Sequence, residues 1–158
     1  MEKRFIKKMK AALVLICALA MAVSLSSCKK SEEDGQNPAM NFVGNYACDR
    51  ANILVEADGD DGMKTTVTWA SSSAEETRWV MSGTFDSEKL VFEYNDCVKT
   101  DVVYDGDGKE KSSEEAYKEG HGLMTFRDGN PLTLTWQDDQ EHQADEMVFE
   151  YAGTGGQE

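Results

Sequence analysis

The residues best suited to chemistry gather in a short acidic window near the C-terminus. Residues 137–146, QDDQEHQADE, combine carboxylates and amides with one imidazole and contain no large apolar side chain. Several such carboxylates are the ligands that a hard cation such as Ca²⁺ accepts. The window lacks, however, the glycine and the closing glutamate that mark a calcium loop. We therefore predict no metal site here, but an exposed interaction loop. Its candidate contact residues are Asp138, Asp139, Glu141 and His142.

The remaining polar residues form no recognisable catalytic motif. The two histidines, His121 and His142, lie in no HExxH sequence and next to no nucleophile elbow. Carboxylate pairs of the kind used in glycoside hydrolysis arise by chance in so acidic a chain. The sequence thus predicts a protein that is not an enzyme and uses no cofactor, with a small hydrolase or a metal-binding protein as the third-ranked alternative.

The N-terminus has the layout of a secretory signal peptide. Residues 1–10 carry five basic side chains against one acid, and residues 11–23 are all apolar. Thirteen helical residues reach about 20 Å, well short of a hydrocarbon core of roughly 30 Å. A permanent membrane span is therefore disfavoured, and we expect residues 1–27 to be removed.

A cysteine follows this segment. The sequence Leu25-Ser26-Ser27-Cys28 resembles the lipobox of bacterial lipoproteins. The resemblance implies diacylglycerol on the Cys28 sulfur, cleavage before Cys28, and commonly a further acyl chain such as palmitate on the new amino terminus. Two or three chains hold a protein stably, because each buried methylene contributes about 0.8 kcal/mol. We expect a membrane-anchored, extracytoplasmic protein, on the periplasmic face or the cell surface.

Two cysteines remain once Cys17 of the signal peptide and the lipidated Cys28 are set aside. Cys48 and Cys97 are 49 positions apart. Two thiols in an oxidising compartment favour one disulfide, and closing so long a loop would contribute about 4 kcal/mol. Neither has the basic or histidine-rich setting of a catalytic thiol. We therefore predict a Cys48–Cys97 bridge.

The charge of the chain excludes one class of partner. Without residues 1–27, 11 basic and 29 acidic residues remain, a net charge of −18. Nucleic-acid binding needs clustered Lys and Arg to replace phosphate counterions. We therefore expect no nucleic-acid partner. The excess favours a basic protein as a partner, or serves solubility alone.

Short windows of alternating apolar and polar residues dominate the chain from Asn45 onward. A period of two predicts half-buried strands. The windows are 53–55, 67–69, 79–81, 90–94, 102–104, 124–126, 132–136 and 147–151. For residues 111–119 we favour a polar strand over a helix. All three tryptophans, Trp69, Trp79 and Trp136, lie at inward positions, where we expect them to fill a core.

Turn signals separate these windows. Short clusters of Asp, Asn, Ser or Gly occur at residues 58–62, 71–73, 82–83, 105–108, 120–122 and 128–130. Eight or nine strands joined by hairpins make an antiparallel meander. We expect this meander to close as a small lipocalin-like or lysozyme-inhibitor-like barrel, because closure removes its edges.

Four segments follow from these patterns. Residues 1–27 are the signal peptide, 28–40 the lipidated cysteine with a flexible acidic tether, 41–152 the β domain, and 153–158 a disordered tail.

The β domain resembles a loose group of uncharacterised small lipoproteins of gut-type bacteria. The matching segments are Gly44-Asn45-Tyr46 and residues 79–85, 94–99 and 134–141. A second resemblance, to membrane-bound lysozyme inhibitors, rests on Tyr46-Ala47-Cys48. The Ser-Gly-x-x-Tyr loop and the Trp-rich ending of that family are absent from this sequence, so no inhibitory residue carries over.

The sequence therefore predicts a lipid-anchored, non-enzymatic binding or interaction module. Its expected partners are the membrane, through the lipid on Cys28, and a basic protein or a small ligand. The alternative function is inhibition of a basic hydrolase such as lysozyme, to which an acidic protein is attracted.

Overall fold

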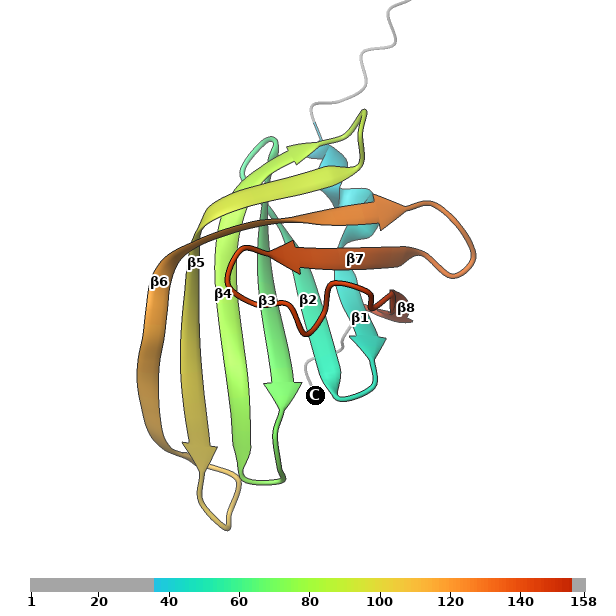
Figure 1. Ribbon diagram of the computed structural model, residues 1–158. Helices are drawn as coiled ribbons and strands as arrows, with labels where there is room; N and C mark the ends of the chain where they lie inside the picture. Colours follow the sequence, from blue (N-terminus) through green and yellow to red (C-terminus); the bar gives the residue numbers. More distant parts are fainter. Residues whose placement is uncertain (1–35, 155–158) are drawn as a thin grey trace, which may run out of the picture. The chain divides into compact units, whose positions relative to one another are not determined.

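The structure is a computed structural model that describes residues 36–154, so Cys28 and residues 155–158 lie outside it. A short 3-10 helix, η1 (Pro38–Phe42), precedes eight antiparallel strands, and β8 returns to pair with β1 (Figure 1). The strands are β1 (Gly44–Cys48), β2 (Ala51–Asp58), β3 (Gly62–Ala70), β4 (Glu75–Asp86), β5 (Val91–Tyr104), β6 (Glu110–Arg127), β7 (Thr133–Asp138) and β8 (Phe149–Gly153). The prediction of an all-β meander of eight strands is confirmed. No helix within the described residues is long and apolar enough to cross a bilayer.

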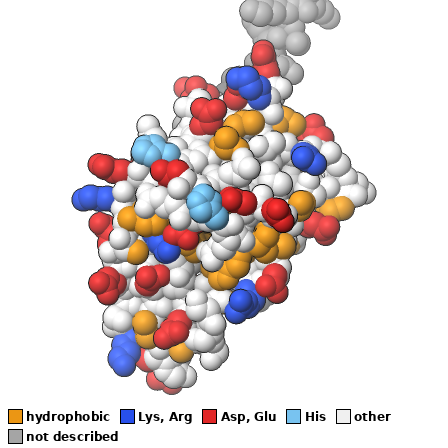
Figure 2. Space-filling model, in the orientation of Figure 1, with side chains coloured by type: hydrophobic (Ala, Val, Ile, Leu, Met, Phe, Trp, Pro, Cys, Tyr) orange, Lys and Arg blue, Asp and Glu red, His pale blue; other side chains and the backbone are white. Residues whose placement is uncertain are grey.

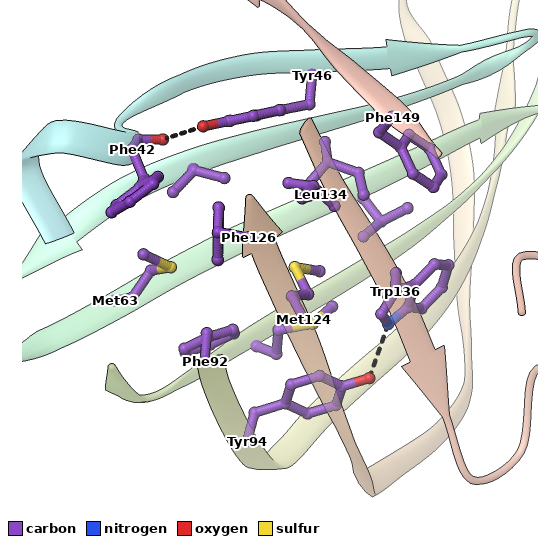
Figure 3. Close-up of a cluster of buried hydrophobic side chains, with 14 of the residues drawn as sticks. Phe42, Tyr46, Met63, Phe92, Tyr94, Met124, Phe126, Leu134, Trp136 and Phe149 are labelled. Carbon is purple, nitrogen blue, oxygen red and sulfur yellow. Dashed lines mark hydrogen bonds between the residues drawn. The ribbon is translucent and has the colours of Figure 1, made fainter. Parts of the chain in front are cut away.

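Aromatic side chains fill the interior of the ring. Strand residues alternate between the two faces of a sheet, and in β2 this buries Ile53 and Val55 while Asn52 and Glu56 stay exposed. Figure 3 shows how rings from different strands meet in the core. The largest fully buried side chains are Trp79, Trp136, Tyr46, Phe92, Phe126 and Phe149. Two of the three predicted core tryptophans are therefore buried, and Trp69 is half-buried.

The folded domain begins earlier than predicted. Asn37 caps η1 by accepting the N–H of Ala39 at 2.8 Å, and its amide donates to the β2–β3 turn, reaching the carbonyl of Gly62 at 2.8 Å. Ala39 is fully buried, and the Tyr46 hydroxyl donates to the Phe42 carbonyl at 2.9 Å. The predicted boundary between the tether (28–40) and the β domain is therefore too late, because residues from Asn37 onward already pack against the domain. At the other end, β8 takes in Gly153, the first residue of the predicted tail.

Two of the predicted turns are wrong. Segments 58–62, 71–73, 105–108 and 128–130 do join strands, and the Asp105 carboxylate accepts the N–H groups of Asp107 and Lys109 at 2.9 Å each. Residues 82–83, by contrast, lie inside β4 at a shift of register, and residues 120–122 lie inside β6. Glycine at these places provides room for neighbouring groups, so it does not mark a chain reversal.

Strands β5 and β6 are longer than the sequence windows indicated. Each joins two windows into one strand, with shifts of register between Tyr94 and Tyr104 of β5. The preference for a strand over residues 111–119 is confirmed, since they form the first half of β6. That half lies at the outer edge of the sheet, and β6 then bends across to β7 (Figure 1).

The predicted disulfide is wrong: Cys48 and Cys97 are both free. Cys48 ends β1, whose neighbours are β2 and β8, whereas Cys97 lies in β5 between β4 and β6. The two thiols therefore belong to strands that are not adjacent in the ring. Cys97 is fully buried and Cys48 is half-buried against the same core.

Candidate functional site

One row of residues crosses three strands at the point where β6 meets β7. Tyr94 of β5 pairs with Gly122 of β6, and Gly122 pairs with Asp138 of β7. Residues in one such row have their side chains on the same face of the sheet, here the inner one. Gly122 has no side chain, so the Tyr94 ring crosses the strand and its hydroxyl donates to Asp138 Oδ2 at 2.7 Å.

Two tryptophan–tyrosine pairs converge on Asp138. Trp136 Nε1 donates to the Tyr94 hydroxyl at 2.8 Å (Figure 3), and Trp79 Nε1 donates to the Tyr117 hydroxyl at 3.1 Å. The Tyr117 hydroxyl lies 3.5 Å from Asp138 Oδ1. Burial raises the pKa of both tyrosines, so they remain neutral donors at any ordinary pH.

Asp138 also begins the loop that follows β7. Its Oδ1 accepts the N–H groups of Gln140 at 2.9 Å and Glu141 at 3.2 Å. The side chain is 5% exposed. The Asp138 carboxylate thus has four donors around it, so its hydrogen-bonding capacity serves the fold.

Two glycines make this arrangement sterically feasible. A Cβ on Gly122 would lie 2.2 Å from the Tyr94 hydroxyl oxygen and 2.4 Å from the Gln137 carbonyl oxygen. A Cβ on Gly120 would lie 2.8 Å from the Tyr117 ring. All three distances are far below van der Waals contact. Tyr94 therefore requires glycine at position 122 of the neighbouring strand, and Tyr117 requires glycine three residues further along its own strand.

An ion pair closes the network on its loop side. Lys99 Nζ pairs with Glu141 Oε1 at 2.5 Å, and the ammonium lies over the rings of Trp79 and Tyr117, 5.3 and 5.7 Å from their centroids. These are cation–π distances. Cys97 is buried beside this group, and burial raises the pKa of its thiol to about 12.

The opposite, outer face of the same three strands carries a hollow. The adjacent row of Glu93, Leu123 and Gln137 points outward, because side chains alternate along each strand. Together with His121 and Asp139 these residues surround a shallow hollow of about 390 Å³, which is also lined by the inner row of Tyr94, Gly122 and Asp138. The hollow thus has a largely apolar floor and a polar rim.

His121 and Asp139 are hydrogen-bonded to each other at that rim. The backbone N–H of Asp139 donates to the His121 carbonyl at 2.9 Å, and the His121 N–H donates to Asp139 Oδ1 at 3.0 Å. His121 Nδ1 lies 3.5 Å from Asp139 Oδ2. The hydrogen bond from the His121 N–H is the main reason that the pKa of Asp139 lies below its usual range, with the His121 ring adding to it.

The structure divides the predicted interaction loop between two environments. Asp138 and Glu141 face inward, where they hold Tyr94 and Lys99. Asp139 faces the outer hollow, and the exposed His142 lies 3.1 Å from Asp145 Oδ2. Among residues 36–154, no three His, Cys, Asp or Glu side chains come together as metal ligands would.

Most residues of the hollow were not among those predicted from the sequence. Glu93, Leu123 and Gln137 carry no motif of their own, and they come together only through strand register. The available signal was Gly120-His121-Gly122. If these residues are taken as part of a strand, the two glycines have no side chains on one face and His121 lies on the other, outer face.

We searched protein-family profiles, curated proteins and solved structures, and none of these comparisons gave a match.

Proposed function

We propose that the protein is a non-enzymatic binding module, anchored by lipid on Cys28 outside the cytoplasm, that holds a small ligand in the outer hollow beside His121. The hollow itself is the observation that carries this proposal. Its volume of about 390 Å³ falls within the roughly 300–1,000 Å³ of small-molecule sites. An apolar floor with a few convergent polar groups is the usual composition of such sites.

The rim indicates the chemistry of the ligand. Glu93 and Asp139 supply carboxylates, Gln137 an amide and His121 an imidazole. A ligand with an apolar part and a cationic amine would place the first on Leu123 and the second among the carboxylates. The inner network supports this role, because it fixes the three strands on which the rim residues are mounted.

The buried groups support a role without catalysis. A thiol whose pKa is raised to about 12 is the opposite of an activated nucleophile. Asp138 accepts from four donors, and the raised pKa values of Tyr94 and Tyr117 keep both hydroxyls protonated, so neither is available as a base.

Ligand binding is tested by mapping amide shift changes on the isotope-labelled full chain in a non-ionic detergent. We expect small amines with an apolar part to shift the amides of His121, Leu123 and Gln137. Leu123→Ser should remove the response, whereas Leu54→Ser should keep it, because Leu54 is a similarly half-buried leucine on the outer face of β2. Shifts that are absent from these amides, or that respond alike to both variants, would contradict the proposal.

The anchor is tested separately. Wild-type cells grown with labelled palmitate should yield a labelled, membrane-bound protein, and Cys28→Ala should abolish both label and membrane association. Cys48→Ala is the matched control, which should retain both. A Cys28→Ala protein that stays processed and membrane-bound would contradict anchoring at this residue.

Inhibition of a basic hydrolase is the second candidate, and surface charge favours it. Acidic side chains (red) are spread over the face in Figure 2, with few basic ones (blue) among them. An inhibitor should bind immobilised lysozyme with an affinity that falls steeply as salt rises. Retention that does not depend on salt, or no retention, would exclude this candidate.

A further inference from the structure

The first half of β6 has a strand neighbour on one side only. β5 pairs with β6 from Glu110 to Thr125, but β7 joins on the other side only from Gly122 onward. The backbone N–H and C=O of His121 are already hydrogen-bonded to Asp139. Within the described part of the chain, residues 110–120 therefore have no strand along their second edge, as the left side of Figure 1 shows.

This edge is long and reaches solvent on both faces. Residues 110–116 are all exposed, although side chains alternate between faces along a strand. Eleven residues at about 3.4 Å each span roughly 35 Å. An edge of this kind presents a row of unpaired N–H and C=O groups, which is the template that an extended peptide uses when it adds a strand.

Charge determines which strand the edge accepts. Four glutamates lie on it, Glu110, Glu114, Glu115 and Glu119, against two lysines, Lys111 and Lys118. Glu114 lies directly opposite Asp101 of β5, and like charges in that position destabilise a strand pair. A cationic side chain placed beside them would relieve this repulsion.

The same charges disfavour a second copy of this chain. Two such edges paired with each other would bring their glutamates together, and charged edge residues commonly prevent self-association in this way. A basic segment meets no such repulsion.

We propose that residues 110–120 of β6 bind an extended, basic segment of a partner protein by strand addition. The segment pairs with the free backbone of β6 and carries Lys or Arg on both faces, beside Glu114 on one face and Glu115 on the other. This surface is distinct from the hollow, although it ends at His121, where the hollow begins.

The test uses the eight-residue peptide Lys-Lys-Val-Thr-Lys-Lys-Val-Thr, which presents lysine on both faces of an added strand, added to the full chain in a non-ionic detergent. Amide hydrogen exchange should slow specifically at residues 110–120, and salt should weaken binding. The same peptide with four consecutive N-methylated residues keeps its charge but cannot pair, so it should give no protection. Equal binding of the N-methylated peptide, or protection elsewhere, would overturn the proposal in favour of charge attraction alone.

Variants separate the edge from the rest of the acidic surface. The double variant Glu114→Gln, Glu115→Gln should weaken peptide binding about fivefold, as expected for two exposed ion pairs. The control Glu56→Gln, Glu150→Gln removes two exposed acids from β2 and β8, and it should leave binding unchanged. Equal weakening in both double variants would overturn the proposal. Protection of residues 110–120 without peptide, growing with protein concentration, would also overturn it, because a second copy would then occupy the edge.

Discussion

The Tyr94 hydroxyl and the Asp138 carboxylate lie 2.7 Å apart across a strand that belongs to neither of them. The contact links β5 to β7 over Gly122 of β6, 44 positions apart in sequence. On the inner face of the sheet, this contact positions two tryptophans and the start of the 139–148 loop. On the outer face, the same three strands form the floor of the hollow. The inner face therefore holds the strands together, and the outer face presents the proposed binding surface.

Removing the Tyr94 hydroxyl should destabilise the protein measurably. Tyr94→Phe leaves Trp136 Nε1 and Asp138 Oδ2 without their buried partner, which costs about 1–3 kcal/mol. Urea denaturation measures the change. Tyr104→Phe is the control, because that hydroxyl bonds to Glu76 and Arg78 near the surface, and its loss should cost no more than about 0.5 kcal/mol. Equal losses would contradict a special role for the Tyr94 contact.

Gly122 should not tolerate even a methyl group. Gly122→Ala places a carbon 2.2 Å from the Tyr94 hydroxyl oxygen and 2.4 Å from a backbone oxygen, so the strands must shift. We expect a loss of about 2–3 kcal/mol, the upper part of the range for overpacking. Gly106→Ala is matched to it, since nothing lies within 4 Å of its added Cβ. Thermal denaturation of the two variants should differ clearly, and similar melting temperatures would contradict the close approach.

The two free cysteines should differ sharply in reactivity. At pH 8, Cys48 is half-buried and should react with a thiol reagent, whereas the fully buried Cys97 should react only after unfolding. Mass spectrometry of tryptic peptides counts the label at each site. Failure of both thiols to react in the unreduced, denatured protein would mean that they are bridged.

The same thiol adds a pH dependence to stability. Burial raises the pKa of Cys97 to about 12, whereas an unfolded cysteine titrates near 8.5. Above about pH 8.5 the unfolded chain loses this proton while the folded one keeps it, so the free energy of unfolding should fall as pH rises. Urea denaturation from pH 7 to 10 should show the fall, and Cys97→Ala should reduce its slope. An unchanged slope in Cys97→Ala would contradict the assignment.

Asp139 should titrate below a normal aspartate even without the His121 ring. The backbone N–H of residue 121 is the main cause of the lowered pKa, and it remains in His121→Ala. Carbon-detected NMR titration should therefore find most of the lowering in that variant. Its stabilising contribution is present above the unfolded pKa of about 3.9 and is lost as pH falls through the lower folded pKa. A normal pKa in His121→Ala would assign the effect to the ring.

Local signals predicted the strands well. Alternation in residues 53–55 or 124–126 depends only on which face is buried, and Asp105-Gly106 turns the chain through its own side chain and backbone. The turn predicted at Gly120 and Gly122 was wrong because these glycines make room for side chains, Tyr117 of the same strand and Tyr94 of β5, and local spacing does not show such contacts. The early start at Asn37 had a local signal, Asn-Pro before an apolar pair, which the charged residues before it obscured.

The cysteines and the hollow could not be predicted for a different reason. Counting thiols says nothing about which strands are neighbours, and β1 and β5 are not. Likewise, Glu93 and Gln137 become neighbours of Leu123 only through the register of β6. The separation of the cysteines and the neighbours of Leu123 both depend on how the strands pair in the ring, and the spacing of residues in the sequence does not show that pairing.

We propose that the outer hollow is the binding site, and a pair of arginine substitutions provides a decisive test. Gln137→Arg adds bulk and positive charge to the rim, and Asn52→Arg makes the same change at an exposed outward position of β2. Calorimetric titration should give an affinity for the best amine ligand at least about tenfold weaker for Gln137→Arg than for the wild type, a change of about 1.4 kcal/mol. Asn52→Arg should bind like the wild type. Equal affinities for all three proteins would contradict the claim.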